Sequence, residues 1–303
     1  MNTPSPITIL DGGMGRELHR IGAPFRQPEW SALALIEAPE RVAEVHEGFA
    51  AAGAQILTTN SYAVVPFHIG EARFAAMGSE LADRAGAVAR GVADRHGIKV
   101  AGSLPPTLGS YQPDLFDPVA GRAILKVLID GLSPHVDFWL AETLSLLAEA
   151  ELVVDLLAGD SRPLWLSFTL DDALDEAGRA VLRSREAVAT AAEMARSSGA
   201  TALLFNCSYP EVMEAAVGEA VVALAGSDIR IGVYANGFGP PPADYSANET
   251  VRDIRADLGP VNYLEWARRW VDAGATMVGG CCGIGPDHIG TLAQRLSESR
   301  PTP

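Results

Sequence analysis

Residues 136–159 have the sequence VDFWLAETLSLLAEAELVVDLLAG, in which a short apolar run (136–143) leads into a longer amphipathic stretch (145–159). A short, continuous apolar run is typical of a strand that is buried on both faces. A helix is the usual connection between two parallel strands. These 24 residues therefore predict one strand–helix unit of a parallel sheet.

The same pattern occurs eight times along the chain. The predicted strands lie at 7–11, 54–61, 99–105, 136–143, 163–170, 200–208, 229–236 and 275–282. The predicted helices lie at 39–52, 78–96, 117–133, 145–159, 184–198, 210–225, 260–273 and 286–297. Eight such units in 303 residues predict an α/β protein with a (β/α)8 TIM-type barrel, as a single domain over residues 1–303 with elaborated loops. An open, doubly wound sheet remains the alternative, because the number of units does not prove closure.

Composition excludes several other classes of protein. The 38 acidic and 23 basic residues give a net charge of −15, which disfavours nucleic acid and anionic membrane surfaces as partners. No apolar run reaches the ~18 residues of a membrane-spanning helix. The first ten residues, MNTPSPITIL, lack the regions of a signal peptide, and three cysteines, two of them adjacent, do not resemble a disulfide framework. We therefore expect a soluble, cytoplasmic protein.

Chemically notable residues gather where the predicted strands end. They are Asp11, Gly12 and Gly13 after the first strand, Asn60, Ser61 and Tyr62 after the second, Glu142 and Thr143 after the fourth, Asn206, Cys207 and Ser208 after the sixth, Asn236 after the seventh, and Cys281 and Cys282 after the eighth. Two proline-rich segments, 103–118 and 236–248, also follow predicted strands. The carboxyl ends of the strands form the active-site face of a barrel, so the sequence predicts a functional site there.

The three cysteines are candidate metal ligands. A catalytic zinc ion has three protein ligands and one open position, and three thiols match that number. Cys281 and Cys282 can bind one ion only if the backbone leaves strand geometry, which the flanking Gly279, Gly280 and Gly283 permit. Three inert buried thiols, or a vicinal disulfide, remain alternatives.

The remaining candidates each have two interpretations. Asp11 either binds a substrate ammonium group or caps the following helix. Glu142 ends an apolar strand, where an unpaired carboxylate is costly, so it pairs either with a substrate cation or with an arginine. Tyr62 and Asn206 are candidate substrate-binding residues, although such residues are more often hydrogen-bonded within the core or a loop.

Five segments together resemble the homocysteine S-methyltransferase family. They are ILDGGMGREL (9–18), WSALALIEAPERVAEVHEGFAAAGAQILTTNSY (30–62), AET (141–143), NCS (206–208) and GGCCGIGPDHI (279–289). The resemblance covers almost the whole chain in the same order, and it implies a (β/α)8 barrel with zinc bound by Cys207, Cys281 and Cys282. It also implies that Asp11 and Glu142 lie near the amino group of homocysteine, with the backbone of Gly12 and Gly13 nearby. Tyr62 corresponds to a family tyrosine close to the metal.

The implied activity is transfer of a methyl group from a small donor to the thiol of homocysteine, which gives methionine. The segment 103–118 departs from the pattern of S-methylmethionine-dependent members, and the chain leaves no room for a cobalamin or folate module. S-methylmethionine or S-adenosylmethionine is therefore the expected donor. The alternatives are a methyltransferase for another small thiol and a zinc-thiolate protein without catalytic activity.

Overall fold

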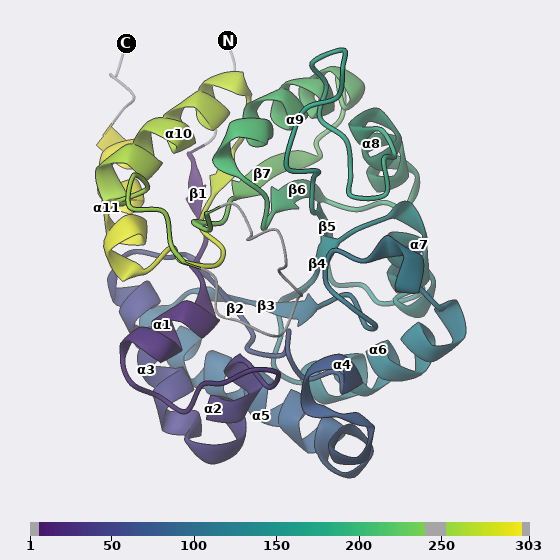
Figure 1. Ribbon diagram of the computed structural model, residues 1–303, viewed down its shortest axis with the longest axis vertical. Helices are drawn as coiled ribbons and strands as arrows, with labels where there is room; N and C mark the ends of the chain where they lie inside the picture. Colours follow the sequence, from purple (N-terminus) through teal and green to yellow (C-terminus); the bar gives the residue numbers. More distant parts are fainter. Residues whose placement is uncertain (1–5, 240–252, 299–303) are drawn as a thin grey trace.

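The computed structural model describes residues 6–239 and 253–298, in which eight parallel strands form a barrel (Figure 1). The strands are β1 (Thr8–Ile9), β2 (Ile56–Thr58), β3 (Lys99–Leu104), β4 (Phe138–Leu144), β5 (Leu164–Phe168), β6 (Ala202–Asn206), β7 (Arg230–Tyr234) and β8 (Met277–Val278). They pair in the order β1-β8-β7-β6-β5-β4-β3-β2, and a parallel bridge between Leu10 and Ile56 joins β1 to β2. The predicted (β/α)8 barrel is confirmed, and the open sheet is wrong.

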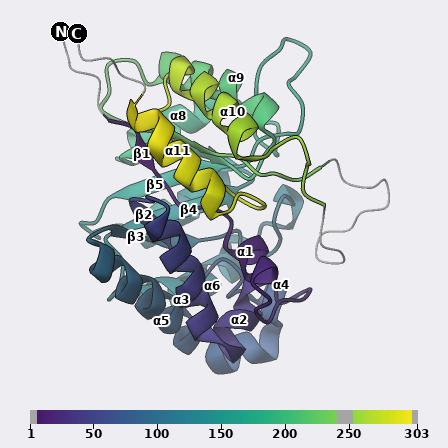
Figure 2. The ribbon, with the colours of Figure 1, turned by 90° about the vertical axis from the view of Figure 1, so that its left-hand side faces the viewer.

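Helices surround the strands (Figure 1). They are α1 (Met14–Arg20), α2 (Ser31–Glu37), α3 (Pro39–Ala51), α4 (Pro66–Ile69), α5 (Glu71–His96), the 3-10 helix η1 (Pro113–Leu115), α6 (Pro118–Leu132), α7 (Leu147–Leu156), α8 (Val188–Ser197), α9 (Pro210–Ala223), α10 (Pro260–Ala273) and α11 (Pro286–Glu298). The last helix, α11, packs against both α10 and α3, which completes the outer layer (Figure 2). Among the described helices, none has the length and apolar character required to cross a membrane.

The eight predicted helices are all present, but α1, α2 and α4 were not predicted. They have seven, seven and four residues, which is too short for a helical period to stand out. The strands are also shorter than the apolar runs that predicted them, because in every unit except the fourth the last residues of the run leave the sheet to form the loops of the site. Of the two proline-rich segments, the first (103–118) begins at the end of β3 and contains η1, whereas residues 240–248 of the second (236–248) lie outside the described residues.

Large side chains fill the interior of the barrel. Phe138 of β4 and Trp165 of β5 pack with their ring centroids 4.2 Å apart, and Leu140, Leu204 and Met277 are buried beside them. This layer closes the barrel below the carboxyl ends of the strands. Any ligand must therefore bind above it.

The loops after β1 and β8 are in direct contact. Gly13 donates a backbone hydrogen bond to Ile284 (2.9 Å), and Gly280 donates one to Asp11 (3.0 Å). A Cβ atom on Gly13 would lie 2.4 Å from the carbonyl oxygen of Cys281, so only glycine fits there. This contact places the two cysteines that follow β8 next to Asp11.

His46 of α3 allows a stability prediction. Its side chain is fully buried, neither ring nitrogen has a hydrogen-bond partner, and burial lowers the pKa of His46 to about 4. The unfolded chain takes up a proton near pH 6.5 that the folded chain cannot, so this residue destabilises the fold increasingly as the pH falls from 6.5 towards 4. We expect His46→Leu to be more stable than the wild type, with an advantage about 2 kcal/mol larger at pH 5 than at pH 7.5. Chemical denaturation at both pH values measures this, and an equal advantage at both would contradict it.

Candidate metal centre and substrate cavity

A cavity of about 190 Å³ opens at the carboxyl ends of the strands. All but one of the residues predicted for the site line it: Asp11, Gly12, Gly13, Tyr62, Glu142, Cys207, Cys281 and Cys282. Asn206 is not among the lining residues. The strand ends thus bring residues separated by more than 250 positions to one place.

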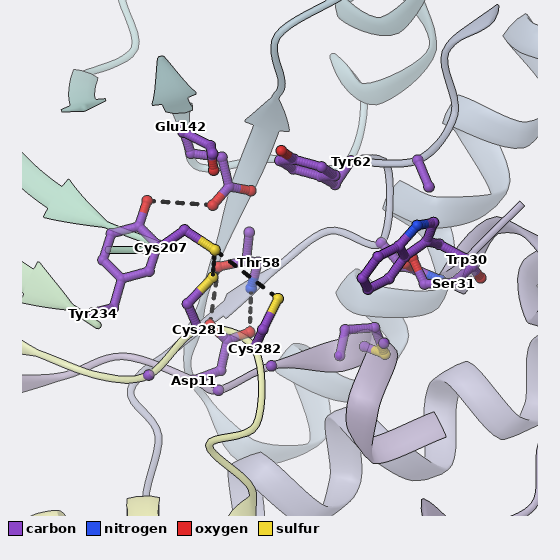
Figure 3. A pocket seen from close by; sticks show the side chains of 18 of the residues that line it. Asp11, Trp30, Ser31, Thr58, Tyr62, Glu142, Cys207, Tyr234, Cys281 and Cys282 are labelled. Atoms are coloured by element: carbon purple, nitrogen blue, oxygen red, sulfur yellow. Dashed lines mark hydrogen bonds between the residues drawn. The ribbon is translucent and has the colours of Figure 1, made fainter. Parts of the chain in front are cut away.

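The three cysteine sulfurs point towards one another (Figure 3). The Sγ of Cys207 lies 2.7 Å from that of Cys281 and 3.9 Å from that of Cys282, and all three sulfurs lie within 4.8 Å of one another. The cysteines are free thiols, so the vicinal disulfide is not formed. Cys207 has a φ angle of 51° directly after β6, and Cys281 and Cys282 follow the end of β8. The required departure from strand geometry is therefore present at both positions.

The donor set fits a thiolate-binding metal ion. Hydrogen bonding with Cys281, Cys282 and Tyr111 lowers the pKa of Cys207 well below its usual range, so one sulfur of the cluster favours the thiolate form. Tetrahedral zinc with Zn–S bonds of ~2.3 Å separates its sulfur ligands by about 3.8 Å. The observed separations of 2.7 and 3.9 Å lie on either side of this value. Small side-chain movements would bring the distances between the three sulfurs to about 3.8 Å.

Asp11 lies directly below the sulfurs (Figure 3). Its carboxylate accepts hydrogen bonds from the backbone N–H (2.7 Å) and the hydroxyl (2.9 Å) of Thr58, and burial raises the pKa of Asp11 to about 7. Helix α1 begins after Gly13 and has no side-chain cap, so the capping interpretation of Asp11 is wrong. The carboxylate instead faces the cavity.

Glu142 lies on the other side of the sulfurs (Figure 3). Its carboxylate accepts hydrogen bonds from the hydroxyls of Ser103 (2.5 Å) and Tyr234 (3.3 Å). Burial raises the pKa of Glu142 to about 7, and the nearby Asp11 adds to this effect. In residues 6–239 and 253–298 no arginine forms an ion pair with Glu142, so the structural ion pair considered for it is absent. Two buried carboxylates thus face one cavity without a cationic partner, which is an arrangement suited to an ammonium group.

Asn206 supports the site from behind. Its side chain is fully buried. The side-chain oxygen accepts hydrogen bonds from the backbone N–H of Thr143 (2.9 Å) and the hydroxyl of Ser167 (2.8 Å). The side-chain amide donates a hydrogen bond to the hydroxyl of Thr143 (2.8 Å). Thr143 has a φ angle of 58°, and the pairing of β4 with β5 shifts register between Ala141 and Leu144. Asn206 therefore holds the irregular end of β4 that presents Glu142, and the substrate contact expected of it stays a prediction.

Aromatic side chains form another part of the cavity wall. Tyr62, whose hydroxyl bonds to that of Ser110 (2.6 Å), lines the cavity with Trp30, Phe67 and His68. The ring centroid of His68 lies 5.0 Å from that of Phe67, 6.3 Å from that of Tyr62 and 6.5 Å from that of Trp30. Burial lowers the pKa of His68 to about 4, so the wall carries no positive charge at neutral pH.

Several residues of the site were missed by the sequence analysis. The hydroxyl of Tyr111 donates to the Sγ of Cys207 (3.0 Å), and Thr58, Ser103 and Tyr234 bind the two carboxylates. Thr58, Ser103 and Tyr234 lie within predicted strands, where their polar groups give no sign of a site. Tyr111 lies within the proline-rich loop after β3, where nothing in the local sequence indicates contact with a cysteine 96 positions away.

Fold and site together define a (β/α)8 barrel with a cluster of three thiols that could hold a metal ion, beside a cavity lined by two carboxylates. The family model described as homocysteine S-methyltransferase matches residues 8–296. The chain therefore belongs to the homocysteine S-methyltransferase family, and so is a methyltransferase.

Relatives of this family match the chain over nearly their full length. The protein named homocysteine S-methyltransferase from Escherichia coli (strain K12) is 29% identical, over 95% of each chain. A selenocysteine Se-methyltransferase from Brassica oleracea var. italica is 26% identical, over 96% of this chain and 89% of the other. Among solved structures, the metallated form of the homocysteine methyltransferase MmuM from Escherichia coli superposes with a TM-score of 0.77 and 26% identity, over 96% of each chain.

Proposed function

We propose that this single-domain protein transfers a methyl group from a small sulfonium donor to the thiol of homocysteine, giving methionine, and that it uses zinc held by Cys207, Cys281 and Cys282. The observation that carries the proposal is the cavity in which three converging sulfurs lie beside two carboxylates that have no cationic partner among the described residues. When bound, zinc would keep the thiol of homocysteine in its thiolate form at neutral pH and would hold the sulfur in place.

The cavity residues have distinct roles in this proposal. Asp11 and Glu142 bind the ammonium group of homocysteine from two sides, which directs its thiol towards the sulfurs. Gly12 and Gly13 line the cavity beside these carboxylates, and the N–H of Gly13 supports the loop through its bond to Ile284. Because these residues come from rigid strand ends, the acceptor is held in one orientation.

The aromatic wall accounts for the donor. A sulfonium cation next to the faces of Trp30 and Tyr62 gains cation–π attraction, which is larger in a desolvated cavity. The cavity of about 190 Å³ is smaller than the roughly 300–1,000 Å³ typical of sites for drug-sized ligands. We therefore favour S-methylmethionine over the larger S-adenosylmethionine, in a cytoplasmic protein whose thiols remain reduced.

The test is an assay of zinc-loaded protein with homocysteine and a panel of donors: S-methylmethionine, S-adenosylmethionine and betaine. S-methylmethionine also becomes methionine when it loses a methyl group, so the homocysteine should carry deuterium on its carbon chain. Mass spectrometry then separates deuterated methionine, the product of the acceptor, from the unlabelled product of the donor. Metal-free protein is the control.

Two outcomes would favour other functions. Competition by cysteine or selenocysteine that exceeds that of homocysteine would indicate another small acceptor, an activity named in the Brassica relative. Tight zinc binding without transfer from any donor would indicate a non-catalytic zinc-thiolate protein.

Proton release provides a second check on this function. A thiol with a pKa of ~8.5 must lose its proton to bind zinc, so homocysteine should release close to one proton at pH 8. At pH 6.5 the release should exceed one, because the pKa values of Asp11 and Glu142 are about 7 and an ammonium group favours their ionised forms. Calorimetry in buffers of different ionisation enthalpy measures both values. No release at pH 8 would argue against thiolate binding.

A further inference from the structure

Tyr111 provides a hydrogen bond to the cysteine cluster from outside it. Its hydroxyl donates to the Sγ of Cys207 at 3.0 Å. The other side-chain hydrogen bonds to the three sulfurs, among the described residues, run between the cysteines themselves. Tyr62, the tyrosine expected near the metal, bonds instead to Ser110.

Two features hold Tyr111 in this position. Its backbone has a φ angle of 64°, which is costly for a residue with a side chain and turns the ring towards the cavity. The guanidinium of Arg183, from the loop after β5, lies 5.2 Å from the ring centroid. Arg183 is itself held by Asp172 (2.6 Å), and its side chain is only 20% exposed.

This arrangement has an electrostatic consequence. A largely desolvated cation over the ring of Tyr111 is attracted to the π system and favours donation of the phenolic proton. The proton points at only one of the three sulfurs, so the hydrogen bond makes Cys207 different from Cys281 and Cys282. Hydrogen bonds to metal ligands orient them and tune the metal.

We propose that Tyr111, held in place by Arg183, is a positioning residue of the metal centre, whose hydroxyl donates to the Cys207 thiolate in the metal-bound protein. This inference rests on the proposed function, because it requires the three cysteines to bind a metal. The hydrogen bond draws charge from the Cys207 sulfur and fixes its direction. It thereby stabilises one arrangement of the three thiolates.

The experiment compares Tyr111→Phe with the wild type in two metal-binding measurements. The substitution removes one oxygen and leaves the ring under Arg183. Zinc affinity, measured by competition with a chromophoric chelator, should fall about tenfold or more. In cobalt-substituted protein, the sulfur-to-cobalt charge-transfer band should move to lower energy, because a thiolate without its hydrogen bond gives up an electron more easily.

Two variants sharpen the test. Tyr62→Phe is the matched control, because it removes a hydroxyl that lies in the same cavity but bonds to Ser110. The zinc affinity and the cobalt band of this variant should match those of the wild type. Arg183→Met keeps the phenol and removes the cation, so both measurements should change in the same direction as in Tyr111→Phe, by a smaller amount. A change in neither would overturn the role of Arg183.

The outcomes separate this inference from the function on which it rests. A wild-type protein that binds neither zinc nor cobalt would contradict the proposed function, and this inference with it. Normal wild-type binding, with an unchanged band and affinity in Tyr111→Phe, would overturn this inference alone. A lower melting temperature of that variant with both measurements unchanged would show a purely structural role and would overturn it as well.

Discussion

Alanine in place of Cys207, Cys281 or Cys282 should lower the zinc content from about one ion per chain to nearly none, and methyl transfer should disappear with it. Each substitution leaves two sulfur ligands in a site whose three sulfurs lie within 4.8 Å of one another. Two thiolates do not complete the three-ligand set of a catalytic zinc ion. Elemental analysis of purified protein and the methionine assay measure the two effects.

The fold should largely survive these substitutions. The cysteines lie above the barrel interior, in which Phe138, Trp165 and their neighbours form the packed layer. Metal-free wild-type protein is the control: the melting temperature of each variant should stay within a few degrees of it, since 1 kcal/mol corresponds to roughly 2–4 °C or less in a protein of this size. Full zinc retention in all three variants would rule out the site.

Glu142→Gln should weaken homocysteine binding about tenfold to a hundredfold. Glutamine keeps the shape of the side chain, but it removes the charge that would pair with the ammonium group. A hydrogen bond to a charged group contributes roughly 1.5–3 kcal/mol, which corresponds to this range of affinity. Titration calorimetry with zinc-loaded protein at pH 8, where the carboxylate is mostly ionised, gives the affinity.

The same variant should be more stable than the wild type at high pH. The pKa of Glu142 is about 7 in the folded chain and 4.5 in the unfolded chain. The contribution of Glu142 to the stability of the fold is therefore present below pH 4.5 and is lost as the pH rises through 7. Removal of the charge should therefore raise stability by less than about 1 kcal/mol at pH 5 and by about 3 kcal/mol at pH 8. Denaturation of ligand-free protein at both pH values checks the sign.

Glu149→Gln provides a matched control for this prediction. Glu149 is also buried with a pKa raised to about 7, but it accepts hydrogen bonds from the backbone at the start of α7 and does not line the cavity. Its substitution should change the pH dependence of stability and leave homocysteine affinity at the wild-type value. Equal affinities of Glu142→Gln and the wild type would sink the substrate-binding role of Glu142.

Much of the fold could be predicted because its signals are local. Each strand appears as a continuous apolar run and each long helix as an amphipathic stretch, so their order along the chain was correct for all eight units. The short helices α1, α2 and α4 were missed because each has seven residues or fewer, which is too few to show a helical period. Closure of the barrel was inferred from the number of units, and the bridge between Leu10 and Ile56 established it.

The sequence by itself determined that the cysteines, Asp11 and Glu142 share one face of the protein, because parallel strands of a barrel place all their carboxyl ends on the same side. Only the tertiary structure decided which of these groups touch. The left-handed backbone of Cys207 and Thr143, and the contact between the loops after β1 and β8, set the distances between the sulfurs and the direction of Glu142. Tyr111 bonds to Cys207, and Asn206 bonds to Thr143, because the fold brings together segments that are remote in sequence. Such contacts depend on packing in three dimensions, which leaves no periodic pattern along the chain.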